Sequence, residues 1–290
     1  MRRTTSKVII NFLALVIASY FLFTSASEIF AQEFIGYSAA GIDANSIKPV
    51  VDAFRNAMGS PNNGNAPGPL TSGRREINWD GGGNNSTTSP APTPFTGFQL
   101  IRGALFTTPG TGFVQAPPFG LATTFNNATY GTLFTTFSPL RLFSAVGSNV
   151  TDVHFFRPGT EIPATVNAFG AVFADVDLPD STSVEYFGPE AESLGKVFVP
   201  PANNGLSFVG VFFTSERIAL VRITSGNTAP GPNESASADA VVMDDFIYGE
   251  PLVGPPTDKN QCKKGGWSEF DFPKAFKNQG DCIQFVNTGK

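Results

Sequence analysis

The sequence predicts a mainly β protein, an antiparallel β-sandwich of the jelly-roll type. Three observations predict this fold. Between residues 95 and 250, short runs rich in Val, Ile, Phe and Thr alternate with turn residues at intervals of roughly 8–15 residues. The chain of 290 residues contains 30 Gly and 23 Pro, which favour turns over long helices. The connections are also too short for the helical crossovers that join parallel strands.

Phenylalanine supplies most of the core that we expect in this body. The chain has 29 Phe but only 5 Tyr and 2 Trp, and a Phe ring has no polar group to keep it at the surface. No helical periodicity of useful length is visible in the region. The predicted strands cover residues 98–106, 111–115, 133–137, 139–146, 151–156, 165–175, 182–188, 194–199, 206–213, 217–224 and 239–248.

The segment before the body, residues 32–94, is expected to hold one helix, one strand and a flexible loop. Apolar residues recur with a helical period from Ser46 to Met58, which predicts an amphipathic helix. Residues 74–80 alternate as a strand that places Ile77 and Trp79 on one face. Residues 81–94 are of low complexity, so we expect them to be the flexible loop.

Residues 1–31 have the features of a secretory signal peptide. Positive charges at the start are followed by an apolar run that is shorter than a membrane span, and Ala31 offers a small residue for cleavage. An uncleaved anchor is the alternative. After cleavage we expect no membrane span, and a location outside the cell or in the periplasm.

The end of the chain forms a separate small unit in this interpretation. A Pro-rich linker, residues 251–260, leads to a tail, residues 261–290, that holds the two cysteines of the chain. In an exported protein, Cys262 and Cys282 are expected to form a disulfide. Such a bond would stabilise a unit too small for a large core.

Composition excludes several function classes. With one His and two Cys, the chain has almost no material for a catalytic triad that needs His or for a His/Cys zinc site. Neither a G-x-S-x-G motif nor a phosphate-binding loop is present. The net charge of −5 disfavours nucleic acid and anionic membranes as partners. We therefore expect a non-enzymatic protein. A carboxylate-dependent carbohydrate-active enzyme is the alternative, and the carboxylates it would draw on are Glu76, Asp80, Glu185 and Glu190.

Two groups of aspartates are candidate Ca²⁺ ligands. Asp244 and Asp245 lie in the last predicted strand, where alternation turns one of them toward the apolar side. Asp175 and Asp177 lie in a predicted hairpin. Ca²⁺ takes hard oxygen ligands of this kind. The alternatives are an Asp that accepts backbone N–H bonds and a polar hairpin loop.

Three stretches resemble a group of secreted bacterial proteins for which no activity is established. They are GRREINWDG (73–81), FTTPGTGF (106–113) and VVMDDFIYGEP (241–251). Residues 165–250 also resemble lectin-like and galactose-binding-like jelly rolls, which implies a sandwich but does not fix a function. The tail, CKKGGWSEF…FKNQGDCIQFV (262–286), resembles a motif appended to the C-terminus of many secreted bacterial proteins. That recurrence implies a portable tail for surface or matrix attachment.

These observations leave three hypotheses for function. The first is a secreted, non-enzymatic protein that binds an extracellular glycan or matrix polymer. The second is a structural or interaction protein of the cell envelope or matrix, with a protein partner. The third is the carboxylate-dependent enzyme.

Overall fold

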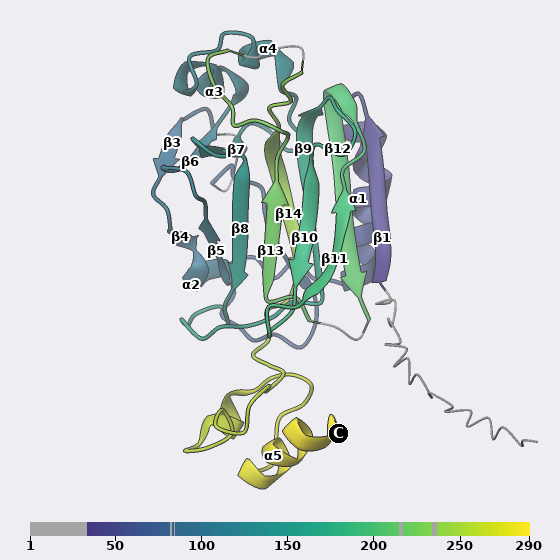
Figure 1. Cartoon of the computed structure of the whole chain (residues 1–290), viewed down its shortest axis with the longest axis vertical. Coiled ribbons are helices and arrows are strands. Elements are labelled where there is room, and N and C mark those ends of the chain that lie inside the picture. The colour runs from purple at the N-terminus through teal and green to yellow at the C-terminus, as the bar shows by residue number, and fades with distance from the viewer. Residues whose placement is uncertain (1–33, 82, 84, 215–216, 234–236) are drawn as a thin grey trace, which may run out of the picture. The chain divides into compact units, whose positions relative to one another are not determined.

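The protein is described by a computed structural model that covers residues 34–81, 83, 85–214, 217–233 and 237–290. The predicted signal peptide, residues 1–31, lies outside these residues. Two sheets stack face to face and every strand pairing is antiparallel (Figure 1). The predicted antiparallel sandwich of jelly-roll type is therefore confirmed.

Sheet A is the larger sheet, with eight strands. Its order is β1-β12-β9-β14-β7-β6-β3, and β2 pairs with the last residues of β14. The bounds of its strands, in the same order, are Phe34–Gly41, Ala202–Phe213, Ala168–Val176, Val242–Gly249, Leu142–Val146, Gly112–Ala116 and Ser89–Ala91, with β2 at Arg74–Ile77.

Sheet B has six strands, in the order β11-β10-β13-β8-β5-β4. In the same order the strands are Ser193–Phe198, Ser183–Phe187, Leu220–Thr224, Val150–Phe155, Ala104–Thr107 and Phe95–Phe98. Its edge strands β11 and β4 come from chain segments far apart in sequence, which is typical of a sandwich with crossing connections.

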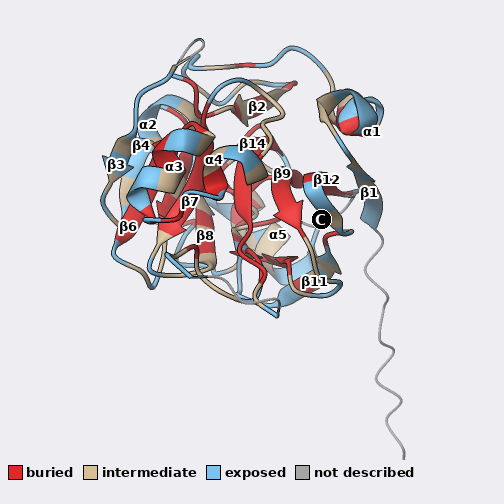
Figure 2. Cartoon of the chain, turned by 90° about the horizontal axis from the view of Figure 1, so that it is seen from above, coloured by how far each residue is buried: buried red, intermediate tan, exposed pale blue. Residues whose placement is uncertain are grey.

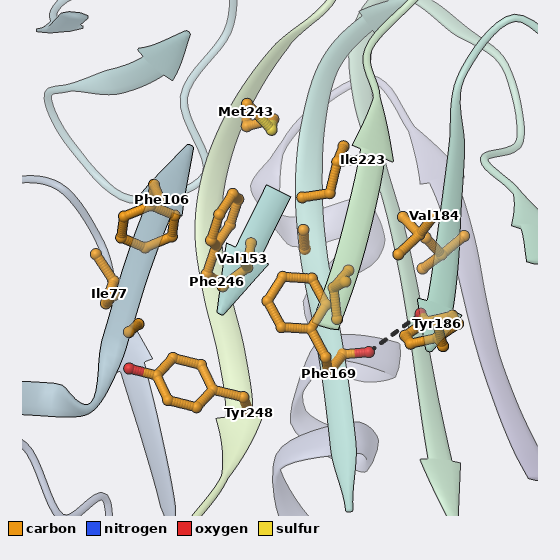
Figure 3. Packing of buried hydrophobic residues seen from close by; sticks show 14 of the residues in the cluster. Ile77, Phe106, Val153, Phe169, Val184, Tyr186, Ile223, Met243, Phe246 and Tyr248 are labelled. Atoms are coloured by element: carbon orange, nitrogen blue, oxygen red, sulfur yellow. Dashed lines mark hydrogen bonds between the residues drawn. The ribbon is translucent and has the colours of Figure 1, made fainter. Parts of the chain in front are cut away.

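The main core lies between the two sheets and is rich in aromatic rings (Figure 3). Phe169 and Phe246 come from sheet A, and they meet Val153 and Tyr186 from sheet B. The hydroxyl of the buried Tyr186 donates to the carbonyl of Phe169 at 3.2 Å, so its polar end is satisfied.

Helices cover the outer face of sheet A and create a second core. They are α1 (Ala44–Met58), α3 (Pro118–Thr124) and α4 (Tyr130–Leu133). Because both faces of the sheet are covered, all nine residues of β9 are buried, as Figure 2 shows for this strand. The side chain of Asp43 caps α1 by accepting the N–H of Ser46 at 2.9 Å.

Phe54 of α1 packs directly on the sheet. Its ring lies over Gly170 and Gly210, which face each other across β9 and β12. A Cβ added to Gly170 would stand 2.8 Å from the Phe54 ring and 2.9 Å from the Cα of Gly210. Glycine is required here because no side chain fits between helix and sheet.

Several element predictions are wrong. The predicted strand 133–137 is the end of α4 and a loop. The predicted strand 98–106 is divided by the short helix α2 (Gln99–Arg102) between the end of β4 and β5. Tyr130, Leu133 and Phe134 have helical spacing and pack against sheet A, a short periodicity hidden by the surrounding strand-like composition. The strands β1 and β3 were not expected, and with β2 they bring residues of the segment 32–94 into sheet A.

The tail folds around the predicted disulfide, which joins Cys262 to Cys282. It contains a 3₁₀ turn (Gly266–Glu269) and α5 (Gln279–Thr288). Both cysteines are buried in a small core that also includes Ala164 of the body and Val253 of the linker. The carboxylate of Asp271 accepts from Arg157 at 2.9 Å and from the backbone N–H of Val253 at 3.0 Å. Among the helices that the structure describes, none has the length and apolar character needed to cross a lipid bilayer.

Candidate functional site

A β-bulge in β14 builds the centre of the candidate site. Met243 pairs with Phe173, but Phe246 pairs with Ala171, so β14 has one residue more than β9 over this stretch. Strand alternation predicted opposite directions for Asp244 and Asp245. The bulge instead brings both carboxylates to one hydroxyl, because Ser138 Oγ lies 2.6 Å from Asp245 Oδ1 and 3.2 Å from Asp244 Oδ1.

Asp244 is fully buried, and both of its carboxylate oxygens have hydrogen-bond partners. Its Oδ2 accepts the backbone N–H of Phe137 at 2.6 Å and that of Ser138 at 3.3 Å. Burial, and next the charge of Asp245, raises the pKa of Asp244 well above its usual range, while the N–H of Phe137 acts in the opposite direction. The backbone N–H bonds match the structural alternative that we considered for this aspartate.

Asp245 and Asp80 complete the acidic group around Ser138. Asp245 Oδ2 pairs with Arg55 at 3.2 Å, and burial raises the pKa of Asp245 despite the Ser138 hydroxyl and this cation. Asp80 Oδ2 lies 3.2 Å from Ser138 Oγ, and its Oδ1 accepts the backbone N–H of Arg141 at 2.8 Å. Burial also raises the pKa of Asp80.

A polar cleft of about 560 Å³ opens beside this group. Its walls come from α1, from β2 and the residues after it, from α2 and from the segment around Ser138. The lining residues are Arg55, Asn62, Glu76, Asn78, Gly83, Arg102, Phe137, Ser138 and Asp245.

The cations and anions of the cleft are held in a fixed arrangement. Arg55 Nη2 binds Glu76 at 2.8 Å as well as Asp245 at 3.2 Å, and its guanidinium lies 5.8 Å from the centre of the Phe137 ring. The other oxygen of Glu76 accepts from Arg74 at 2.6 Å. Each partner restrains the rotamers of the next, so the cleft is preorganised.

A smaller hollow of about 270 Å³ adjoins the cleft. The two share Asn78 and Arg102, which form the boundary between them. The hollow adds one amide, Asn65, and the edges of aromatic side chains, among them Phe98. Amide and guanidinium groups that line a concave surface suit a ligand rich in hydroxyl groups.

The other predicted aspartates lie in a different environment. Asp175 Oδ1 accepts the backbone N–H of Asn204 at 2.7 Å, and the N–H of Asp177 donates to Asp239 at 3.2 Å. Burial, and next the charge of Asp239, raises the pKa of Asp177. Asp175 and Asp177 therefore have different hydrogen-bond partners from Asp244 and Asp245.

The calcium prediction for all four aspartates stays a prediction. Within the described part of the chain, no group of three or more Asp, Glu, His or Cys side chains is arranged to hold a metal ion. The four carboxylates considered for an enzyme do not all lie together in the structure. Glu76 lines the cleft and Asp80 lies beside it. Glu185 is on β10 of sheet B, where it is paired with Arg222 of β13, and Glu190 is in the turn before β11.

Sequence reasoning found Glu76 and the aspartates but missed the residues that surround them. Arg55 was on the polar face of a predicted helix, which gave no indication of a partner. Arg102, Phe137 and Ser138 were assigned to or beside predicted strands. No motif links these positions, because chain segments far apart in sequence meet only in the folded sandwich.

The fold and cleft define a class of protein: an antiparallel β-sandwich with a polar surface cleft. No protein-family model matches the chain, and no curated protein matches it. Among solved structures, the chain is similar to a mutant of the lectin binding domain of Lectinolysin complexed with Lewis b. That similarity has 9% sequence identity and a TM-score of 0.23, and covers 62% of this chain and 99% of the other. At this level it does not assign a ligand to the cleft.

Proposed function

We propose that this protein is a non-enzymatic binding protein for an extracellular glycan or matrix polymer, and that the polar cleft is its binding site. The observation that carries the proposal is the lining of the cleft. Asn62, Asn78 and Arg102 offer amide and guanidinium groups to hydroxyls, and Phe137 offers an apolar surface to a sugar ring. A volume of about 560 Å³ accommodates a few sugar units.

Binding without turnover is favoured by the state of the carboxylates. Both oxygens of Glu76 are ion-paired, with Arg55 and with Arg74. Asp245 is almost completely buried and engages Arg55 and Ser138. A general acid or base needs a carboxyl that reaches the substrate, and the partners of these two groups already occupy their oxygens.

An oxidising location outside the cytoplasm is part of the proposal. The Cys262–Cys282 disulfide is typical of exported proteins. The export signal predicted from residues 1–31 points to the same compartment.

The proposal is tested by retention of the mature protein on a panel of insoluble polysaccharides, with reducing sugar assayed in the supernatant. We expect retention without soluble product. Asn78→Ala should weaken retention at least about tenfold, since a sugar site depends on a few placed polar groups. Asn203→Ala, at an exposed position on β12, is the matched control and should have no effect.

The other outcomes of this experiment identify the alternatives. No retention on any polysaccharide would overturn the proposal and favour a protein partner. Soluble product that disappears in Glu76→Gln would favour the enzyme instead. Repeating the assay in chelator tests the predicted calcium role of Asp175, Asp177, Asp244 and Asp245. Unchanged retention would leave these carboxylates with structural roles.

A further inference from the structure

Arg102 occupies a distinctive place in the candidate site. It is the last residue of α2, and it lines both the cleft and the smaller hollow. The helix ends there because Gly103 adopts a left-handed conformation, with φ of 71°. A Cβ on Gly103 would stand 2.2 Å from the carbonyl oxygen of Phe156, so this turn is fixed by packing.

The guanidinium of Arg102 is held rigidly by neutral groups. Its Nε donates to the side-chain oxygen of Asn65 at 2.8 Å, and its Nη1 donates to the backbone carbonyl of Glu76. It also lies 5.6 Å from the centre of the Phe98 ring. Further N–H groups of the guanidinium remain for a ligand, since an arginine has more donors than these contacts use.

The charge of Arg102 has no carboxylate partner among the described residues, unlike the charges of Arg55, Arg74 and Arg75. Arg55 and Arg74 pair with Glu76, and Arg75 pairs with Glu250 at 2.7 Å. Burial, followed by the charge of Arg75, lowers the pKa of Arg102, while Tyr248 and Glu76 act in the opposite direction. A half-buried cation without a counter-ion carries a desolvation cost that an anionic ligand offsets.

We propose that Arg102 binds an oxyanion on the ligand, so that the cleft selects an acidic glycan, one bearing carboxylate or sulfate groups, over a neutral one. The inference rests on the proposed function, because it names the class of glycan for the same cleft. The planar guanidinium matches an oxyanion with two parallel hydrogen bonds. The carboxylates of the cleft do not compete for it, since Glu76 and Asp245 are held by Arg55 and, for Glu76, also by Arg74.

The test compares charged and neutral polymers that share a backbone. The mature protein is titrated with soluble polygalacturonate and its fully methyl-esterified form, and with dextran sulfate and dextran. We expect at least about tenfold tighter binding to the acidic member of at least one pair, with a preference that falls as salt is raised. The two pairs distinguish a carboxylate from a sulfate.

Variants then assign the preference to one residue. Arg102→Gln should abolish the preference for acidic polymers. Arg102→Lys should keep part of this preference, because lysine retains the positive charge but cannot form the two parallel hydrogen bonds of a guanidinium. Arg222→Gln is the matched control, since Arg222 pairs with Asp152 at 2.8 Å on sheet B, and it should bind like the unmodified protein. Thermal unfolding of each variant shows that it is folded.

The outcomes separate the two proposals. Failure of all four soluble polymers and of the insoluble panel to bind would overturn the proposed function itself. Equal binding of acidic and neutral members would overturn the selection for acidic glycans and leave glycan binding in place. A preference that persists in folded Arg102→Gln would overturn the role of Arg102.

Discussion

The indole N–H of Trp79 donates a hydrogen bond of 2.8 Å to the backbone carbonyl of Asp244. Trp79 is buried in the main core, where its ring stacks on Phe143 with centroids 3.8 Å apart. Asp244 lies in the bulge that carries the acidic group beside the cleft. One side chain therefore joins the bulge beside the cleft to the interior of the sandwich.

Trp79→Phe should destabilise the protein by about 2–4 kcal/mol, because it removes buried area and leaves the Asp244 carbonyl without this donor. The measurement is urea unfolding at neutral pH. The other tryptophan of the chain, Trp267, is partly exposed in the tail. Trp267→Phe is thus the matched control, with an expected loss of less than about 1 kcal/mol. Equal losses in the two variants would contradict the anchoring role.

Asp244→Asn should flatten the dependence of stability on pH. Burial raises the pKa of Asp244 above its ordinary value of 3.8. Between that value and the raised pKa, the folded state binds more protons than the unfolded state, so stability falls as pH rises through this window. Asparagine resembles the protonated acid and removes this loss.

The measurement is the unfolding temperature from pH 4 to 8, with chelator present to exclude bound metal. Asp43→Asn is the control, because the hydroxyl of Ser46 lowers the pKa of Asp43 and that group cannot cause a loss at higher pH. An unmodified protein that is equally stable from pH 4 to 8 would show that the Asp244 carboxyl does not titrate in this range.

Gly170→Ala should cost about 1–3 kcal/mol, because the new methyl group would overlap the Phe54 ring and the backbone of Gly210. Gly36→Ala on β1 is the matched control, since a Cβ there meets only the Phe34 ring at 3.8 Å. Denaturant unfolding of both variants measures the difference. A Gly170→Ala protein as stable as Gly36→Ala would show that α1 does not pack on the sheet as closely as described.

Removing the disulfide should release the tail and leave the sandwich folded. Cys262 and Cys282 are both buried in the small core of the tail, which includes Ala164 and Val253 but is a cluster separate from the two cores of the body. The double substitution to Ser should cost the tail about 3 kcal/mol. Limited proteolysis should then cut first within residues 261–290. First cuts in the body would mean that the tail stabilises the sandwich.

The parts of the fold that could be predicted are those that depend on patterns within a short stretch of sequence. Strand alternation placed Ile77 and Trp79 in the core, and helical spacing found α1. The disulfide was predicted from two cysteines in a chain that the sequence predicts to be exported. The edge strand β1 was missed because its small residues, FIGYSAAG, give a weak pattern, and its place is set by pairing with β12.

The candidate site was predictable only in part. Asp244 and Asp245 could be identified as candidates from the sequence, because a carboxylate buried in an apolar strand needs hydrogen-bond, ion-pair or metal partners. Their common direction depends on a bulge, which adds one residue relative to β9 and has no signature in β14 alone. The meeting of Arg55 with Asp245 joins positions 190 residues apart, which no spacing rule connects.

The most direct test of the central claim is amide hydrogen exchange of the mature protein with and without the polysaccharide fragment that it retains. If the cleft is the binding site, exchange should slow in the residues that border it, in α2 and in the segment 134–141, while β11 on sheet B stays unchanged. Protection confined to β11 or to the tail, with the segments of the cleft unchanged, would contradict the assignment of glycan binding to this cleft.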